Sequence, residues 1–214
     1  MRKPPRRFAA VVAETSLYFK QFSVGYMQNF AYLIGDKKTK ECVMVDPAWD
    51  VDAILKEAKA DGMKVVAGIL THTHFDHCNG VEQLVEKTGV KIYVHENEAK
   101  YIKEIKNHLV ETKEGSTLKI GSVEMTFLHT PGHTEGSQCI LVEGKLVSGD
   151  TLFAGACGRC DLPGGDERKM QASLKRLAAL DPELEVYPGH AYNDVEFSTI
   201  GHERRTNPFM HFQN

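Results

Sequence analysis

The stretch His72-Thr73-His74-Phe75-Asp76-His77 is the most informative part of the sequence. It follows Val65-Val-Ala-Gly-Ile-Leu70, whose near-continuous apolar character predicts a buried strand. Apolar residues at helical spacing over 81–85 then predict an amphipathic helix. The polar stretch therefore occupies a loop between a strand and a helix, where a short segment can direct its side chains into one small volume.

Four side chains of this loop are potential metal ligands, namely His72, His74, Asp76 and His77. Imidazole nitrogen and carboxylate oxygen suit zinc, iron or manganese. In extended backbone, alternation puts His72 and His74 on the same side, and Asp76 and His77 can then face a second ion. A histidine-rich loop can also be solvated surface, but four donors within six residues favour a metal centre.

Three further candidate ligands share one local setting, a short polar turn directly after an apolar strand. They are His133 in Thr130-Pro-Gly-His-Thr134, Asp150 in Ser148-Gly-Asp-Thr151 and His190 in Tyr187-Pro-Gly-His190. The glycine of each turn lets the backbone turn tightly and approach a site. Each turn alone is a common structural feature, but together with the loop at 72–77 the three turns complete a set of seven donors for two metals.

The other apolar segments alternate between strand and helix patterns, with Asp50 placed to cap the first helix. Two sheets that face each other, with helices outside, account for this order better than a purely parallel sheet, so we expect an α+β fold of four layers in one domain. The expected strands are 17–22, 30–34, 42–45, 65–70, 92–94, 123–128, 138–142, 145–148 and 184–187, and the expected helices are 51–60, a segment around 81–85, 96–105, 170–179 and 195–205.

Composition limits the partners that the chain can have. Its 214 residues, 42% hydrophobic and 26% charged, suffice for one compact domain with a sizeable core. The formal net charge of -3 argues against an electrostatic hold on nucleic acid or on an anionic membrane. No run approaches the roughly 20 apolar residues that a membrane-spanning helix needs. We therefore expect a small-molecule substrate and no nucleic-acid or membrane partner.

The N-terminus and the cysteines bear on location. The basic segment 1–8 contains two prolines and is expected to be a disordered extension of a domain at 9–214. The five cysteines are odd in number and scattered, which does not suggest a disulfide framework. The pair Cys157 and Cys160 would suit redox chemistry or zinc, although one such pair alone is weak support for either. We expect a cytoplasmic protein, either a monomer or a homodimer.

The order and spacing of these motifs resemble the metallo-β-lactamase superfamily, and specifically its glyoxalase II-like branch of hydroxyacylglutathione hydrolase-like proteins. The matching motifs are Thr71-His-x-His-x-Asp-His77, Pro131-Gly-His133, Gly149-Asp-Thr151 and Pro188-Gly-His190. The segments 149–154, 158–166 and 203–208 resemble the same branch. The resemblance implies an αββα metallo-β-lactamase sandwich with two divalent metal ions, zinc first, with iron or manganese as alternatives.

The resemblance also implies a role for each ligand. The implied sets are His72, His74 and His133 for the first metal, Asp76, His77 and His190 for the second, and Asp150 as the bridge. Two ions about 3.5–4 Å apart can share a water, lower its pKa toward roughly 7 and polarise a carbonyl. We therefore expect a metal-bridging hydroxide to cleave a small thioester or ester, a glutathione conjugate being one candidate, with Asp76 and Asp150 as the catalytic residues.

Two other activities are compatible with the same motifs. Persulfide dioxygenases resemble this branch but use a single iron, held by the positions that match His72, His133 and Asp150. The segments 157–159 and 187–192 resemble that family, whereas 162–166 resembles the hydrolases. A lactonase is the third candidate, because bound hydroxide attacks a lactone by the same mechanism. Hydrolysis of a thioester or ester is the preferred hypothesis.

Two residues near the ligands are candidates for binding the substrate. Arg159 could bind a substrate carboxylate through its guanidinium fork, although an ion pair with Asp161 or Asp166 is an equal alternative. Tyr192 could hydrogen-bond the substrate near the metals, or pack at the start of a helix. Full-length glyoxalase II proteins carry an extra C-terminal helical region for glutathione, which we do not expect beyond the helix predicted at 195–205.

Overall fold

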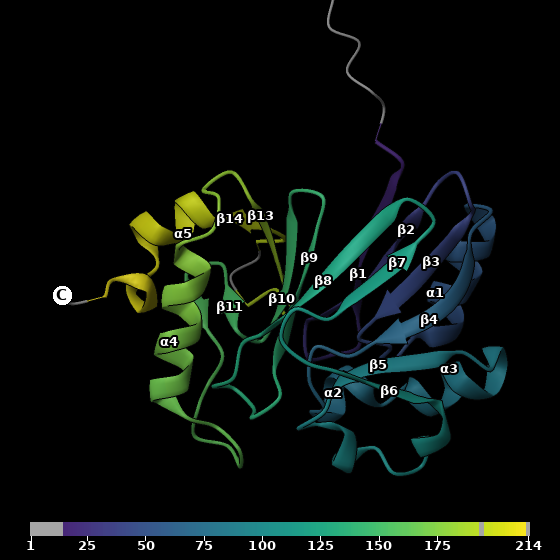
Figure 1. The fold of residues 1–214 in the computed structure, drawn as a ribbon, viewed down its shortest axis with the longest axis horizontal. Helices are drawn as coiled ribbons and strands as arrows, with labels where there is room; N and C mark the ends of the chain where they lie inside the picture. Colours follow the sequence, from purple (N-terminus) through teal and green to yellow (C-terminus); the bar gives the residue numbers. More distant parts are fainter. Residues whose placement is uncertain (1–14, 193–194, 213–214) are drawn as a thin grey trace, which may run out of the picture.

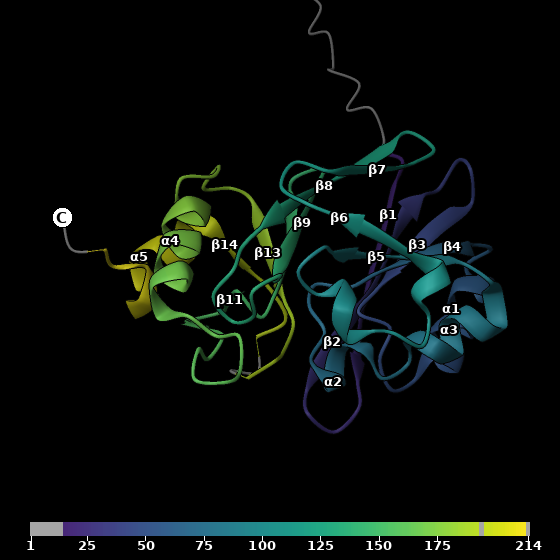
Figure 2. The ribbon, with the colours of Figure 1, turned by 60° about the horizontal axis from the view of Figure 1, so that its bottom comes forward.

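Two sheets pack face to face at the centre of the structure, and helices cover their outer surfaces (Figure 1). This computed structural model describes residues 15–192 and 195–212. A view turned by 60° shows the same succession of helices, sheet, sheet and helices (Figure 2). The expected α+β sandwich of four layers is therefore confirmed, while the extension predicted at 1–8 lies outside the described residues.

Six strands form the first sheet, in the order β1 (Leu17–Val24), β2 (Asn29–Asp36), β3 (Glu41–Val45), β4 (Lys64–Ile69), β5 (Lys91–His95) and β6 (Leu109–Thr112). Pairing is antiparallel up to β3 and parallel from β3 onward. Parallel neighbours need a crossover. The helices that make the first two crossovers are α1 (Val51–Ala60) and α3 (Val81–Thr88).

Six strands also form the second sheet, in the order β14 (Ser198–Thr199), β13 (Glu185–Pro188), β10 (Lys145–Gly149), β9 (Gln138–Val142), β8 (Val123–His129) and β7 (Thr117–Ile120). Among the described strands of this sheet, only β10 and β13 pair in parallel, and α4 (Glu167–Ala178) lies between them in sequence. Beside α4 packs α5 (Ile200–Thr206). A small hairpin consists of β11 (Leu152–Phe153) and β12 (Ala156–Cys157).

Alternating side chains of the strands fill three apolar layers. In β2, Ala31 and Leu33 face the layer under α1 and α3, whereas Phe30, Tyr32 and Ile34 face the layer between the sheets. This alternation follows from the period of two in a strand. A third layer lies between the second sheet and the helices α4 and α5. Because both faces of each sheet are covered, the loops at the strand ends start from fixed positions.

Two predicted helices differ from the structure. The segment 96–105 forms no α-helix; 3-10 turns occur instead at Ala99–Tyr101 and Lys106–His108. The buried Ile102 and Ile105 are three residues apart, and this spacing does not distinguish the two helix types over a short run. The helix predicted at 195–205 begins only at Ile200, because residues 198–199 pair with β13.

Other parts of the prediction are closer to the structure. The helix at 51–60 has the expected bounds, although Asp50 makes no side-chain capping hydrogen bond. The strands β6, β7, β11 and β12 were not predicted, nor was the short helix α2 (Phe75–Cys78). No helix in the described part of the chain is long and apolar enough to span a membrane.

Candidate metal centre

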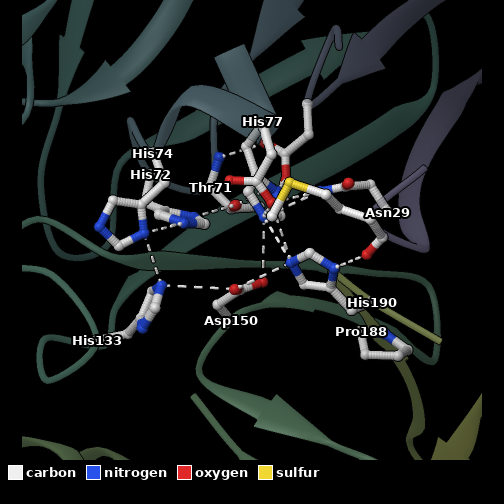
Figure 3. A network of polar contacts seen from close by, with 12 residues as sticks. Asn29, Thr71, His72, His74, His77, His133, Asp150, Pro188 and His190 are labelled. Carbon is white, nitrogen blue, oxygen red and sulfur yellow. Dashed lines mark hydrogen bonds and ion pairs between the residues drawn. The ribbon is translucent and has the colours of Figure 1, made fainter. Parts of the chain in front are cut away.

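All seven predicted ligands converge on one site. Figure 3 shows the side chains of His72, His74, His77, His133, Asp150 and His190 around it. The segment after β4, which includes α2, supplies four of them, and the loops after β8, β10 and β13 supply His133, Asp150 and His190. Local backbone explains the arrangement of the first four. His74 has extended dihedral angles, and α2 begins directly after it. The extended part therefore directs His72 and His74 into the first group of candidate ligands, and the helical turn directs Asp76 and His77 into the second.

The first group of ligand atoms comes from His72, His74 and His133. His72 Nε2 lies 3.1 Å from His74 Nδ1, and His74 Nδ1 lies 2.8 Å from His133 Nε2. His72 and His133 are almost fully buried, whereas His74 is half-buried. Three nitrogens that face one small volume match the first predicted ligand set.

The second group of ligand atoms comes from Asp76, His77 and His190. Its ring nitrogens, His77 Nε2 and His190 Nε2, are 3.1 Å apart, and His190 Nε2 lies 3.4 Å from Asp76 Oδ2. Asp150 reaches both groups, with Oδ2 at 3.5 Å from His133 Nε2 and at 3.3 Å from His190 Nε2. Its position between the groups is the one expected for a bridging carboxylate.

Hydrogen bonds on the far side of four rings fix how these rings face the centre. The Nδ1 atoms of His133 and His190 lie 2.8 Å and 2.9 Å from the backbone carbonyls of Arg159 and Met27. A carbonyl only accepts, so each Nδ1 carries the proton and each Nε2 presents a lone pair to the centre. The carboxylate of Asp46 likewise accepts from His77 Nδ1 at 3.0 Å, and the Thr71 hydroxyl, which donates its own proton to Asp46, accepts from His72 Nδ1 at 3.1 Å.

The donor set fits a divalent cation. Asp150 Oδ1 is buried and has no hydrogen-bond partner within the described part of the chain. Buried polar atoms are rarely left unpaired, and nitrogen lone pairs that face each other at 2.8–3.1 Å need a shared proton or a cation between them. Imidazoles and carboxylates in overlapping groups, within 4.8 Å of one another, are suitable ligands for zinc, iron or manganese.

Electrostatics keep His72, His74 and Asp150 in states that can bind a metal. Burial lowers the pKa of His72 and His74, and the neighbouring histidines lower it further, so both rings stay neutral with a free lone pair. Burial opposes ionisation of Asp150, but the adjacent His77 holds the pKa of Asp150 well below its usual range. The same pairing, aided by Asp46, raises the pKa of His77 against the effect of its burial.

Asp46 is a buried site residue that the sequence analysis missed. Its carboxylate accepts hydrogen bonds from the Thr71 backbone N–H and hydroxyl, both at 2.7 Å, and lies 3.0 Å from His77 Nδ1. Asp46 thus connects the end of β3 to the loop after β4. The available sequence signal was an acidic residue directly after the buried strand 42–45 and before Pro47.

Glu98 is a second buried residue that was missed. One carboxylate oxygen accepts from the Thr73 backbone N–H at 3.0 Å and from the Thr73 hydroxyl, and the other accepts from the Gly136 N–H at 3.0 Å. Thr73 lies between two ligands of the first group, and Gly136 follows the third, His133. Glu98 therefore holds two ligand-bearing loops together.

Both predicted substrate-binding residues lie at the site, where a recess of about 300 Å³ is lined by His133, Asp150, Arg159 and Tyr192. The Arg159 guanidinium forms two hydrogen bonds of 2.7 Å with Asp161, which is the alternative considered for it. Tyr192 stacks on the ring of His190. Burial and then the nearby Asp150 raise the pKa of Tyr192 to about 12, so its hydroxyl remains a hydrogen-bond donor.

Cys157 and Cys160 are free thiols in this structure. Burial raises the pKa of Cys157 to about 11, and Cys160 adds to the effect. Redox and zinc chemistry both use the thiolate, which is scarce near neutral pH at such a pKa. Neither thiol belongs to a group of candidate metal ligands among the described residues.

The fold and this donor set define a metal-dependent enzyme of the αββα kind. The profile of the metallo-beta-lactamase superfamily matches residues 24–190, which contain all seven candidate ligands. The chain belongs to the metallo-beta-lactamase superfamily. This finding confirms the resemblance noted in the sequence.

Individual members of the superfamily are also similar to this chain. The probable polyketide biosynthesis zinc-dependent hydrolase BaeB of Bacillus velezensis is 33% identical over 167 residues, covering 78% of this chain and 74% of that protein. The hydroxyacylglutathione hydrolase of Maricaulis maris is 35% identical over 183 residues, covering 85% and 69%. The solved structure of TTHA1623 in a di-iron-bound form has a TM-score of 0.78 and 32% identity, covering 89% of this chain and 99% of that one. These similarities are consistent with the glyoxalase II-like branch.

Proposed function

We propose that the protein hydrolyses a small thioester or ester in the manner of glyoxalase II. The observation that carries this proposal is the second group of donors, Asp76, His77 and His190, joined to the first by Asp150. The one-iron alternative needs only His72, His133 and Asp150, whereas a second group of three donors in place is suited to two ions. The hydrolase names of the similar proteins support the same reaction class.

The chemistry assigns a task to each residue. Two divalent ions, when bound, would lower the pKa of a shared water toward roughly 7 and polarise the carbonyl under attack. Asp150, ionised and placed between both groups, holds the two halves of the centre at a fixed separation. Asp76 accepts a hydrogen bond of 2.8 Å from the Asn29 side-chain amide, which fixes the orientation of its carboxylate.

The leaving group of a thioester needs little help from an acidic group of the protein. A thiolate leaves readily because the pKa of a thiol is about 8–9, so little acid catalysis is needed. Tyr192 stays protonated and can donate a hydrogen bond to the substrate. Arg159 can bind a carboxylate of the leaving group in place of Asp161. This exchange of partners is feasible because the side chains of Arg159 and Asp161 are both largely exposed. A glutathione conjugate fits this description, and a lactone would react at the same centre.

The metal content of the purified protein tests the proposal. We expect elemental mass spectrometry of protein purified without added metal or chelator to find close to two ions of zinc, iron or manganese per chain. Such protein should hydrolyse at least one member of a panel of acyl thioesters, aryl esters and lactones. About one iron per chain, with oxygen consumption in the presence of a persulfide and no hydrolysis, would overturn it.

A mononuclear-iron persulfide dioxygenase is the second candidate. The specific observation in its favour is that His72 and His133 share one group of candidate ligands, and that Asp150 Oδ2 lies 3.5 Å from His133 Nε2. A similar protein whose structure holds iron makes that metal reasonable here. For either activity we propose a cytoplasmic location, supported by five cysteines that are all free.

A further inference from the structure

A recess on one side of the candidate metal centre has no role in the chemistry described above. This His74 recess has a volume of about 390 Å³, and its walls include His74, Glu98, Tyr101, Glu135, Leu162 and Pro163. Tyr101 comes from the 3-10 turn after β5, and Leu162 and Pro163 come from the segment before α4. His74 also belongs to the first ligand group, so the recess opens directly beside the reacting centre.

The two carboxylates in this wall are already occupied. Glu98 accepts three hydrogen bonds from Thr73 and Gly136 and is almost fully buried. Glu135 pairs with Lys169 through contacts of 2.7 Å and 2.9 Å. Among the described residues that line the recess, none is a lysine or arginine. An anionic ligand group would therefore find no free cation there. The hydroxyls of Thr73 and Thr134, which also line the recess, are hydrogen-bonded to Glu98 and Ser137, and Tyr101, Leu162 and Pro163 supply apolar surface.

A second recess at the centre has a different character. This recess, lined by His133, Asp150, Arg159 and Tyr192, offers a guanidinium and a phenol hydroxyl. His74 lines the first recess and His133 lines the second, and His74 Nδ1 lies 2.8 Å from His133 Nε2, so the two recesses reach the centre at adjacent rings. A carbonyl placed at that pair has one substituent directed to each recess. The recess at His74 suits an apolar substituent, and the recess at Arg159 suits a polar one.

We propose that the His74 recess binds the apolar acyl chain of the substrate, and that the thiol or alcohol part occupies the recess with Arg159. The inference rests on the proposed hydrolase function. Hydrolysis breaks the bond from the acyl carbon to sulfur or oxygen; water supplies the oxygen of the carboxylic acid and the proton of the released thiol or alcohol. The substrate class is thus an uncharged acyl group of several carbons, in preference to acetyl or a short hydroxyacyl group.

A chain-length series tests the inference in the metal-loaded enzyme. We expect kcat/KM for acetyl, butyryl, hexanoyl and octanoyl thioesters of one thiol to rise by about fourfold per added methylene until the recess is full, because burying a methylene contributes about 0.8 kcal/mol. Leu162→Ser should lower the hexanoyl-to-acetyl ratio of kcat/KM by about tenfold. Equal kcat/KM across the wild-type series would overturn the inference.

A matched substitution controls for general effects of polarity. Val195 is also an apolar residue at the surface, but it lines a different cavity, together with Phe197 and His202. We expect Val195→Ser to leave the hexanoyl-to-acetyl ratio within twofold of the wild type. A ratio that falls equally in Val195→Ser and Leu162→Ser would remove the recess from acyl recognition.

Binding without turnover separates this inference from the proposed function. In NMR titrations of metal-free labelled protein, hexanamide should shift resonances of Tyr101 and Leu162 at concentrations where acetamide does not. If those shifts occur but no thioester or ester is hydrolysed, the hydrolase proposal fails and the apolar binding site stands. If thioesters are hydrolysed but neither the shifts nor the chain-length dependence is found, only the acyl-site inference fails.

Discussion

At His77 the two ring nitrogens face different partners. Nδ1 lies 3.0 Å from Asp46, and Nε2 lies 3.1 Å from His190 in the second ligand group. His72 belongs instead to the first group, which both a two-metal and a one-metal enzyme would use. Substitution of these two histidines therefore separates the two candidate reactions at the scale of one residue.

We expect His77→Ala to lower kcat/KM for thioester hydrolysis by at least about 100-fold, because loss of outer partners of metal ligands alone costs 10–100-fold. His72→Ala should abolish either activity. Steady-state kinetics with elemental analysis of each variant provides the measurement. Full hydrolysis by His77→Ala with one metal per chain would show that the second group does not take part.

Glu98 allows a second test at this scale. In Glu98→Gln an amide N–H₂ replaces one of the accepting oxygens and faces a backbone donor, so the link between Thr73 and Gly136 is lost on one side. We expect the affinity of the first metal site to fall by about 10–100-fold, the range found for partners of metal ligands. Chelator competition, followed by the cobalt(II) absorption spectrum, measures this affinity.

Glu57→Gln is the matched control for that test. Glu57 lies on α1, where its half-exposed side chain pairs with Lys20 at 3.0 Å. The Glu57→Gln variant should bind metal with the affinity of the wild type. An unchanged cobalt spectrum and affinity in Glu98→Gln would mean that Glu98 supports the fold without positioning the ligands.

Local sequence patterns indicate the candidate ligands better than the residues that support them. The loop at 72–77 holds four donors side by side, and the other three follow Pro-Gly or Gly-Asp turns, so local patterns indicate all seven. Asp46 and Glu98 act on residues 25 positions away in the sequence. A single carboxylate outside any motif gives no local sign of such a contact.

At the scale of elements, the start of α4 supports the turn that carries His133. The Asp166 backbone N–H donates to the Gly132 carbonyl at 2.8 Å, and the Ser173 hydroxyl donates to the Pro131 carbonyl at 2.7 Å. A Cβ on Gly132 would lie 2.4 Å from Met170 Cα. The helix and the turn are thus in backbone contact, which requires glycine at this position.

Gly132→Ala should therefore destabilise the protein and move His133. Its φ of +145° disfavours a side chain, and the clash is with backbone that cannot rotate away. We expect a loss of about 2–4 kcal/mol in the free energy of unfolding, measured by urea denaturation.

Gly144→Ala isolates the backbone effect, because Gly144 also has a positive φ, of +79°, but no atom within 4 Å of an added Cβ. We expect a loss of only about 1 kcal/mol there. Similar losses in both variants would show that the contact with Met170 is unimportant.

The sequence predicted strands correctly where most of their side chains are buried, on both faces of the sheet, as in β2, β3 and β4. It failed at the half-exposed strands β6 and β7, where only Thr112 and Ile120 are fully buried and the apolar pattern is weak. It also failed at 96–105, because Ile102 and Ile105 suit more than one helical form. Short elements that are stabilised mainly by contacts with neighbouring elements have no clear pattern in the local sequence.

At the scale of the whole molecule, metal binding should stabilise the fold, because ligands come from both sheets. A ligand that binds only the folded state at 100 times its Kd contributes about 2.7 kcal/mol, equivalent to roughly 5–10 °C in a chain of this size. We expect removal of metal by a chelator to lower Tm by that amount. A thermal scan with and without chelator measures it.

His72→Ala is the control for this prediction, since its first site lacks a ligand. The chelator should change the Tm of that variant by less than half as much. An equal shift in both proteins would indicate metal bound elsewhere, and no shift in the wild type would contradict coupling between the centre and the fold.

The division of the ligands between the sheets has a consequence for how the chain could be cut. Residues 113–116 alone connect β6 to β7, the last strand of one sheet to the first in sequence of the other. Severed there, the polypeptide would become two pieces with four and three of the seven donors. Neither piece would hold a complete centre. Metal uptake would then report reassembly, and enzyme would form at a rate proportional to the product of the two concentrations.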